Sequence, residues 1–364
     1  MNPSSNTSRL PWLDFASGIM ILWMIIYHAI VCAWEYDIRD LWGITDAALI
    51  PEGIHAFINN EGKLEVLNPC VLFPWLHFFM PWFFYKSGQF FKKRSTKDLW
   101  KKDSQKLLKT FVIWSAIGYV FFLLFGYIND TLTLRGATYS IMRGLFLRGQ
   151  IPINGPCWFL LTLFGVRFVA NKLLPERGDK YTWLKIVGVV LAGYLISYLA
   201  YRFDYRLIPY WVANGAAGMS FFVLGYAMRD WDCKLLLIIP CVLVYIICCF
   251  VGFPVIDMMD NELLLGNYLF WIPVAFCCII VFNTFCRCTY QFTRILSLEW
   301  IGMEAMVIYV VHFIIAQVVI FTMNILDVDV QSLLIIFIIL IAYMLLIYFV
   351  NYILKQFKDE NSIF

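Results

Sequence analysis

The sequence predicts an all-α integral membrane protein, a bundle of about ten transmembrane helices with both termini in the cytoplasm. Hydrophobic residues make up 62% of the 364-residue chain and charged residues only 15%, whereas a soluble domain carries about 25% charged residues. The apolar residues gather in runs of about 20, the length that crosses a bilayer as a helix. Most Lys and Arg residues lie between these runs, on one side of the membrane, as the positive-inside rule describes.

Ten apolar runs are long enough to be membrane spans. In chain order they are 12–33, 71–91, 110–128, 156–174, 184–202, 211–228, 235–253, 267–285, 299–323 and 331–353. The first run is long enough to span and has no clear small-residue cleavage site, so we interpret it as a span and not as a signal peptide. Prolines fall in or beside three runs, at Pro81, Pro156 and Pro273, where neighbouring helices can satisfy the freed backbone groups.

Lys and Arg residues set the orientation of the bundle. With the N-terminus in the cytoplasm, twenty of the 28 lie on the inner side and seven on the outer side, while Lys86 lies within the second span. The largest inner group is the run of eight in residues 92–109. This asymmetry predicts an N-in, C-in protein. Because the connections are mostly short, we expect one transmembrane domain over residues 1–364.

Composition and motifs argue against several classes of protein. The net charge of +3 is too small to indicate nucleic-acid binding. The chain has no Walker A, HExxH or GxSxG motif, and no GxGxxG after a strand. Its eleven cysteines lack a metal-ligand framework, so we expect no metal site. Cys32 and Cys70 lie at the outer ends of the first two spans, where they either form a disulfide or remain free thiols.

His28 is the first candidate for chemistry, because ionisable groups within spans are costly and often functional. It lies about 24 Å past Trp12 by helix rise, nearer the outer face. A neutral imidazole can take a proton from a hydroxyl that attacks an acyl carbon. The alternative is a structural hydrogen bond to a facing helix. His312 is expected to form such a bond, His77 to lie at the interface, and His55 to be solvated.

Asp14, Lys86 and Glu304 are further ionisable residues in or beside spans. Asp14 lies at the inner mouth of the first span, where it belongs to a site, caps the helix or faces a basic loop. Lys86 interrupts the second span and can snorkel, pair with a carboxylate or meet substrate. Glu304 either carries a proton or forms a structural hydrogen bond. By themselves these groups suit an enzyme or a transporter.

Five segments resemble the acyltransferase-3 family of integral-membrane O-acyltransferases. They occur in the family's order and spread over nearly the whole chain: WLDFASGIMILWMIIYH (12–28), MPWFFYKSGQFFKKR (80–94), GPCWFLLTLFGVRF (155–168), FFVLGYAMR (221–229) and IGMEAMVIYVVHF (301–313). The resemblance implies an acyl-CoA donor on the cytoplasmic side and a hydroxyl acceptor reached from the other side. His28 matches the family's first-span histidine, Asp14 its aspartate near the start of that span, and Trp158 a tryptophan expected to line the cavity.

The resemblance also suggests which groups hold the donor. Arg94 and Arg229, with the lysines of 92–109, are candidate contacts for the phosphates of coenzyme A, although the positive-inside rule explains these charges without a ligand. Lys86 and Trp158 complete the candidate donor-binding set. The candidate catalytic residues are His28, Asp14 and Glu304.

The expected function is therefore that of an O-acyltransferase, in the simplest case an O-acetyltransferase, in a bacterial cytoplasmic membrane. It would use acetyl-CoA or another acyl-CoA and no metal. Its partners would be a surface polysaccharide or lipid-linked glycan and membrane lipid, but not nucleic acid. Two other classes stay open: a transporter or flippase, and a non-catalytic subunit of polysaccharide export.

Ser17 departs from the family pattern. The family commonly places an arginine eleven positions before the first-span histidine, and that position is Ser17 here. Lys86 stands where the family usually has an apolar residue before the Ser87-Gly88 step. We hypothesise that Lys86 supplies the charge that Ser17 lacks, and predict that Lys86→Ala abolishes activity without loss of expression.

Overall fold

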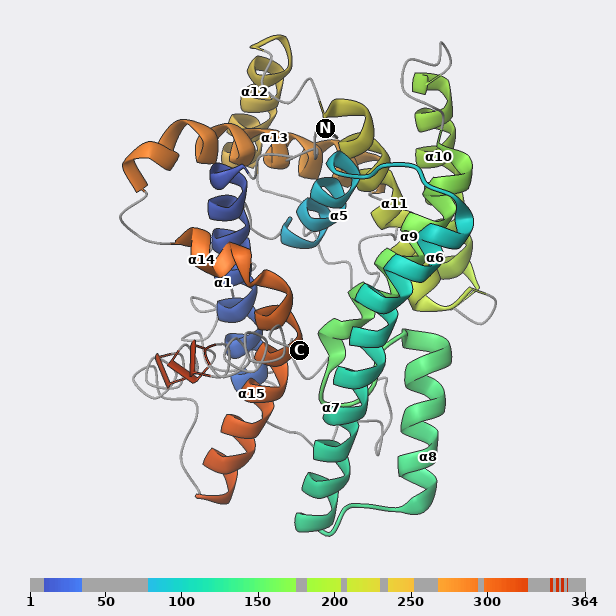
Figure 1. Ribbon diagram of the computed structural model, residues 1–364, viewed down its shortest axis with the longest axis vertical. Coiled ribbons are helices and arrows are strands. Elements are labelled where there is room, and N and C mark those ends of the chain that lie inside the picture. The colour runs from blue at the N-terminus through green and yellow to red at the C-terminus, as the bar shows by residue number, and fades with distance from the viewer. Residues whose placement is uncertain are drawn as a thin grey trace, which may run out of the picture.

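The computed structural model describes residues 10–34, 78–174, 182–203, 208–229, 235–251, 268–293 and 298–326, with short pieces between 341 and 352. Every regular element in these ranges is helical. The principal helices are α1 (Pro11–Trp34), α5 (Phe79–Gln89), α6 (Thr96–Asp103), α7 (Lys109–Ile128), α8 (Leu134–Arg143), α9 (Trp158–Leu173), α10 (Thr182–Arg202), α11 (Tyr210–Met228), α12 (Leu235–Val251), α13 (Tyr268–Thr293), α14 (Leu298–Met303) and α15 (Ala305–Ile325). In Figure 1, α1, α7 and α15 run lengthwise and α13 runs across one end.

The predicted all-helical class is confirmed throughout the described ranges, and most predicted spans coincide with a helix. One exception is the span predicted at 299–323, which is divided into α14 and α15 by a turn at Glu304. Another is the span predicted at 71–91, whose described part forms only the eleven-residue α5. The span predicted at 331–353 lies largely outside the described residues. The number of ten spans and the N-in, C-in orientation stay predictions.

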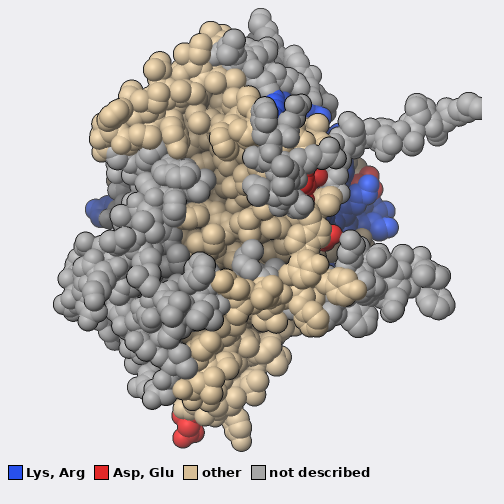
Figure 2. Space-filling model, turned by 90° about the vertical axis from the view of Figure 1, so that its left-hand side faces the viewer, with Lys and Arg blue, Asp and Glu red and all other residues tan. Residues whose placement is uncertain are grey.

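Four helices of the described part are long and apolar enough to cross a membrane. They are Thr96–Ile128, Trp183–Ala200, Trp271–Tyr290 and Ala305–Met323. On α10, exposed apolar side chains recur every three or four residues, at Leu184, Val187, Leu191 and Leu195. Figure 2 shows a face that is mostly uncharged where it is described, with Lys and Arg gathered toward its edges. An apolar surface of this extent needs a bilayer or another apolar cover.

Glycines allow α5 and α11 to touch along their backbones. A Cβ built at Gly88 would overlap the backbone oxygen of Phe222, and one built at Gly225 would overlap the backbone oxygen of Tyr85. Small residues permit this close approach in membrane helix pairs. The contact fixes the Lys86-Ser87 step of α5 within the bundle.

Glycines likewise join α1 to α14. A Cβ at Gly302 would overlap the backbone oxygen of Asp14, and a Cβ at Gly18 would overlap that of Leu298. The start of α1 is thereby held against the short helix that precedes α15. This contact sets the position of the rest of α1 relative to α15.

The connection at 129–155 contains a helix that the hydrophobic pattern did not predict. Thr133 caps α8 by accepting a hydrogen bond from the Gly136 N–H at 3.0 Å. The Tyr119 hydroxyl of α7 donates to the Ala137 carbonyl at 3.2 Å, and the two helices lie side by side in Figure 1. The cap at Thr133 thus stabilises the first turn of α8, and the hydrogen bond from Tyr119 holds α8 along α7.

The chain between α8 and α9 enters the core in a strained conformation. Buried Ile153 has a φ of 66°, which is unusual for a β-branched residue and must be imposed by its surroundings. The next residue, Asn154, is fully buried and donates to the carbonyls of Trp114 at 3.1 Å and Val310 at 3.4 Å. These bonds tie the segment to both α7 and α15.

Candidate functional site

Two histidines from distant parts of the sequence meet in the core. His28 on α1 and His312 on α15 approach through His28 Nδ1 and His312 Nε2, 3.0 Å apart. The ring of Phe313 packs edge-on against His28, with centroids 5.4 Å apart. His28 retains 9% exposure whereas His312 retains none. Of the pair, His28 is therefore the one that keeps any exposed surface.

The backbone and side chain of Tyr309 hold the α15 side of this pair. His312 Nδ1 lies 2.6 Å from the Tyr309 carbonyl oxygen. The Tyr309 hydroxyl donates to the carbonyl of Pro156, at the entrance to α9. Phe159, one residue into that helix, packs its ring 5.7 Å from the Tyr309 ring. The histidine pair is thus fixed by α1, α15 and the start of α9.

His312 was predicted to bond a neighbouring helix, and it does. Sequence reasoning missed that the partner is the candidate base itself. The only signal was the place of His312 within the segment 301–313 that resembles the family. No spacing rule reveals a contact between residues 284 positions apart.

Lys86 brings a positive charge to Ser17. Its Nζ donates to the Ser17 hydroxyl, which itself donates to the Leu13 carbonyl at 2.6 Å. The ammonium also lies 5.3 Å from the centre of the Trp82 ring, a distance at which a cation interacts with an aromatic face. The structure therefore joins the two positions where the sequence departs from the family pattern. The catalytic importance of Lys86 stays a prediction.

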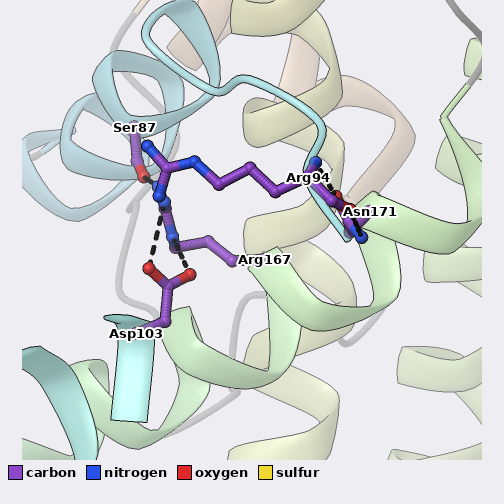
Figure 3. Close-up of polar contacts among 5 residues, drawn as sticks. All are labelled: Ser87, Arg94, Asp103, Arg167 and Asn171. Atoms are coloured by element: carbon purple, nitrogen blue, oxygen red, sulfur yellow. Dashed lines mark hydrogen bonds and ion pairs between the residues drawn. The ribbon is translucent and has the colours of Figure 1, made fainter. Parts of the chain in front are cut away.

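Ser87, which follows Lys86 on α5, contacts Arg167 on α9. Figure 3 shows Arg167 held by Asp103, with Nε to Oδ2 at 2.7 Å and Nη2 to Oδ1 at 3.3 Å, while its Nη1 donates to Ser87 at 3.2 Å. The Arg94 side chain extends toward the same place (Figure 3). Two guanidinium groups, those of Arg94 and Arg167, therefore converge beside Ser87, and Asp103 pairs with Arg167. Guanidinium groups bind anions through paired hydrogen bonds, so this cationic cluster of Arg94 and Arg167 is suited to bind an anion.

Asn171 fixes the backbone at Arg94. Its side-chain oxygen accepts from the Arg94 N–H at 3.0 Å, and its amide donates to the Arg94 carbonyl at 2.9 Å (Figure 3). Ser95, the next residue, caps α6 through the Asp98 N–H at 3.1 Å. Lys93 donates to the carbonyl of Leu174, just beyond the end of α9, at 2.8 Å. The segment between α5 and α6 is therefore anchored on both sides of Arg94.

Arg229 lies toward the same end of the bundle. It follows Tyr226 by one turn at the end of α11, just as Arg94 follows Phe91 by three residues. The rings of Phe91 and Tyr226 pack with centroids 6.3 Å apart. The prediction that Arg94 and Arg229 contact the phosphates of coenzyme A stays a prediction. Sequence reasoning missed Arg167, whose signal was its place in the segment 155–168.

The other candidate residues lie at different depths. Asp14 precedes His28 by fourteen residues on α1, about 21 Å by helix rise, and packs its backbone on Gly302. Glu304 lies in the turn just before α15 and is half-buried. The structure therefore does not bring Asp14 to the histidine pair. Any part that these two carboxylates play in transfer stays a prediction.

Trp158 belongs to the histidine end of the bundle. It is buried at the start of α9, next to Phe159, and precedes Arg167 by nine residues, about 13 Å along the helix. It was predicted as a donor-binding, cavity-lining residue. This placement puts it away from the cationic cluster and nearer the reacting end.

The predictions for His55, His77 and Cys70 concern residues that lie outside the described ranges. The described residues include no group of three or more His, Cys, Asp or Glu placed to hold a metal ion. Buried thiols among them, such as Cys277 and Cys278, are in reduced form. They pack as small apolar groups in the core.

The histidine pair and the cationic cluster are separated along a single helix. Ser17, which contacts Lys86, and His28 are eleven residues apart on α1, about 16 Å by helix rise. Positive charge thus lies toward one end of α1 and a pair of imidazoles toward the other.

A helical bundle with an apolar outer surface and a buried polar site of this kind is a membrane-protein architecture suited to an enzyme. The family model for the acyltransferase domain matches residues 10–352, nearly the whole chain. The chain therefore belongs to the acyltransferase-3 family and is an acyltransferase, a membrane enzyme that moves an acyl group from a donor to an acceptor. Comparison with curated proteins and with solved structures gave no match.

Proposed function

We propose that the protein is an O-acyltransferase of the bacterial cytoplasmic membrane that moves an acyl group, in the simplest case acetyl, from cytoplasmic acyl-CoA to a hydroxyl of a cell-surface glycan or its precursor. The observation that carries the proposal is His28, which keeps 9% exposure and lies about 16 Å along α1 from Ser17, the residue that the Lys86 ammonium contacts. A base at one end and anion-binding groups at the other suit a donor whose phosphates are remote from its thioester.

The cationic cluster supports coenzyme A as the carrier. Arg94 and Arg167 bring two positive charges toward Ser87, Asp103 pairs with Arg167, and the Lys86 ammonium reaches Ser17 on α1. Guanidinium groups bind phosphate through paired hydrogen bonds, and their planar fork suits this geometry. An extended pantetheine arm would then run along α1 toward the histidine pair. Arg229, which follows the end of α11, is proposed to add a further contact to the phosphates.

His28 supports transfer to a hydroxyl. In the proposed step its unprotonated nitrogen takes the proton of the acceptor O–H while that oxygen attacks the thioester carbon. The C–S bond then breaks, and the proton passes from His28 to the departing sulfur, which yields an ester and free coenzyme A. General-base assistance of this kind contributes about 10²–10⁴-fold to the rate.

The test is transfer of labelled acetyl from acetyl-CoA to surface glycan in membranes that contain wild-type protein or His28→Ala at matched expression. We expect label transfer by the wild type and a loss of about 10²-fold or more in the variant. An Arg135→Ala variant, which removes an exposed charge on α8, is the matched control and should transfer normally.

Transfer at the wild-type rate by His28→Ala would remove this residue from the site. An absence of transfer by the wild type, with other acyl-CoA donors also inactive, would favour an export subunit without catalysis. Movement of lipid-linked glycan without any donor would instead indicate a flippase.

A further inference from the structure

We propose that His312 is a positioning residue that selects the tautomer of His28 and thereby prepares it as the base. The inference rests on the proposed function, in which His28 receives the acceptor proton. It goes beyond that function because it assigns a role to a residue with no exposure and specifies which nitrogen of His28 reacts.

The Tyr309 carbonyl can only accept a hydrogen bond. Because His312 Nδ1 lies 2.6 Å from that oxygen, this nitrogen must carry the proton. In a neutral imidazole the other nitrogen, Nε2, is then unprotonated and is an acceptor. The hydrogen bond along the backbone of α15 therefore determines the protonation pattern of His312.

The same logic extends to His28. Its Nδ1 lies 3.0 Å from His312 Nε2, and an acceptor there requires that His28 Nδ1 be the donor. In that tautomer His28 Nε2 is unprotonated. The chain from the Tyr309 carbonyl through His312 thus fixes one tautomer of His28, in which Nε2 is the nitrogen that can take a proton.

This arrangement parallels the carboxylate or carbonyl that orients the histidine in many catalytic sites. Here a second imidazole takes that place. When His28 accepts the acceptor's proton at Nε2, its Nδ1–H continues to donate to His312, so the resulting imidazolium is stabilised without any further proton movement. His312 itself, being fully buried, acts only through His28.

The activity test compares His312→Phe with His312→Gln in the acetyl-transfer assay. Phe retains a ring but has no acceptor, and we expect kcat to fall about 10²-fold or more. Gln can place its amide oxygen near the former Nε2, and we expect it to recover at least a tenth of the wild-type kcat. The KM for acetyl-CoA should change less than about twofold in both, because the cationic cluster lies about 16 Å away along α1.

A kcat for His312→Phe above a third of the wild-type value would overturn the proposal. So would equal losses in the Phe and Gln variants accompanied by a raised KM, since that pattern indicates a general loss of structure.

A second measurement needs neither activity nor a His312 variant. The chain has four histidines, so replacing His55 and His77 by Gln leaves only the pair to be observed. The ¹⁵N spectrum of histidine-labelled protein in lipid then reports both tautomers. We expect each imidazole to be protonated at Nδ1, the form that is less populated for free imidazole side chains.

Protonation of His28 at Nε2 with a bare Nδ1 would overturn the proposal even in an active enzyme. If the wild type transfers no acyl group, the proposed function fails while this spectrum still decides whether His312 sets the tautomer of His28.

Discussion

At the scale of single residues, Lys86 and Ser17 show how a charge can be supplied from a different helix. The family commonly has an arginine on the first span, whereas here an ammonium from α5 reaches the corresponding serine. Lys86 also stands beside Ser87, which contacts Arg167. A single dipeptide of α5 therefore links α1 to the cationic cluster.

We predict that Lys86→Ala lowers acetyl transfer roughly tenfold or more, since a hydrogen bond to a charged group is worth about 1.5–3 kcal/mol. The double variant Ser17→Arg with Lys86→Leu returns the charge to α1 and should recover part of the loss. Both are measured in the membrane assay at matched expression, with Arg135→Ala as the control. Unchanged activity in Lys86→Ala would remove this residue from the site.

The sequence was informative about residues whose role depends on type and local position. His28, Arg94 and Lys86 could be selected because a charge or an imidazole within or beside an apolar run is costly. His312 and Arg167 were undervalued, because their importance arises from partners on other helices. Such contacts depend on helix packing, which local spacing does not determine.

At the scale of helices, the α5–α11 contact positions the donor end of the site. Gly88 and Gly225 leave no room for a side chain at the crossing. Because Lys86 and Ser87 precede Gly88 directly, a wider crossing would move both away from Ser17 and Arg167. Helix packing therefore explains the glycine at position 88, and the contact with Arg167 explains the serine at position 87.

We predict that Gly225→Ala destabilises the protein by about 1–3 kcal/mol, the usual cost of overpacking, because the new methyl meets the Tyr85 backbone. Thermal unfolding in detergent measures the change. Gly165→Ala is the matched control, since a Cβ there meets nothing within 4 Å. The control should be neutral or stabilising by up to about 1 kcal/mol, because Ala favours helix over Gly. Equal stability of both variants would contradict the tight crossing.

Helix boundaries followed the hydrophobic runs well where each run is one straight element. The prediction was less accurate at Glu304 and at α8, for different reasons. The turn at Glu304 interrupts a continuous apolar run, so hydropathy alone does not reveal it. The helix α8 is short and amphipathic, and its stability depends on its cap at Thr133 and its contact with Tyr119.

At the scale of the whole molecule, the distribution of charge predicts the orientation in the membrane. Lys and Arg are concentrated in 92–109, and the structure places Arg94 of that segment in the cationic cluster. If the end of the bundle that carries Arg94 binds cytoplasmic acyl-CoA, that end must face the cytoplasm. The positive-inside rule predicts the same orientation. The fold class was predictable from composition, whereas the number of spans depends on segments outside the described residues.

We predict that peptide tags at either terminus are protected from external protease in spheroplasts, because the positive-inside rule predicts that both ends are cytoplasmic. A tag inserted at the Asn129–Asp130 turn, which joins α7 to α8, should be cleaved. Permeabilised cells, in which all three tags are cleaved, provide the control. Cleavage of a terminal tag in intact spheroplasts would contradict the predicted orientation.

The position of Ser17 and His28 on one uninterrupted helix makes α1 a spacer of fixed length. Exchanging one lipid-facing side chain for another leaves that spacing unchanged. Inserting or deleting one residue between them shifts one end by about 1.5 Å and turns it by about 100° relative to the other. The helix α1 should therefore tolerate changes in its composition far better than changes in its length. The arm of the acyl carrier must in turn be long enough to span the distance from Ser17 to His28.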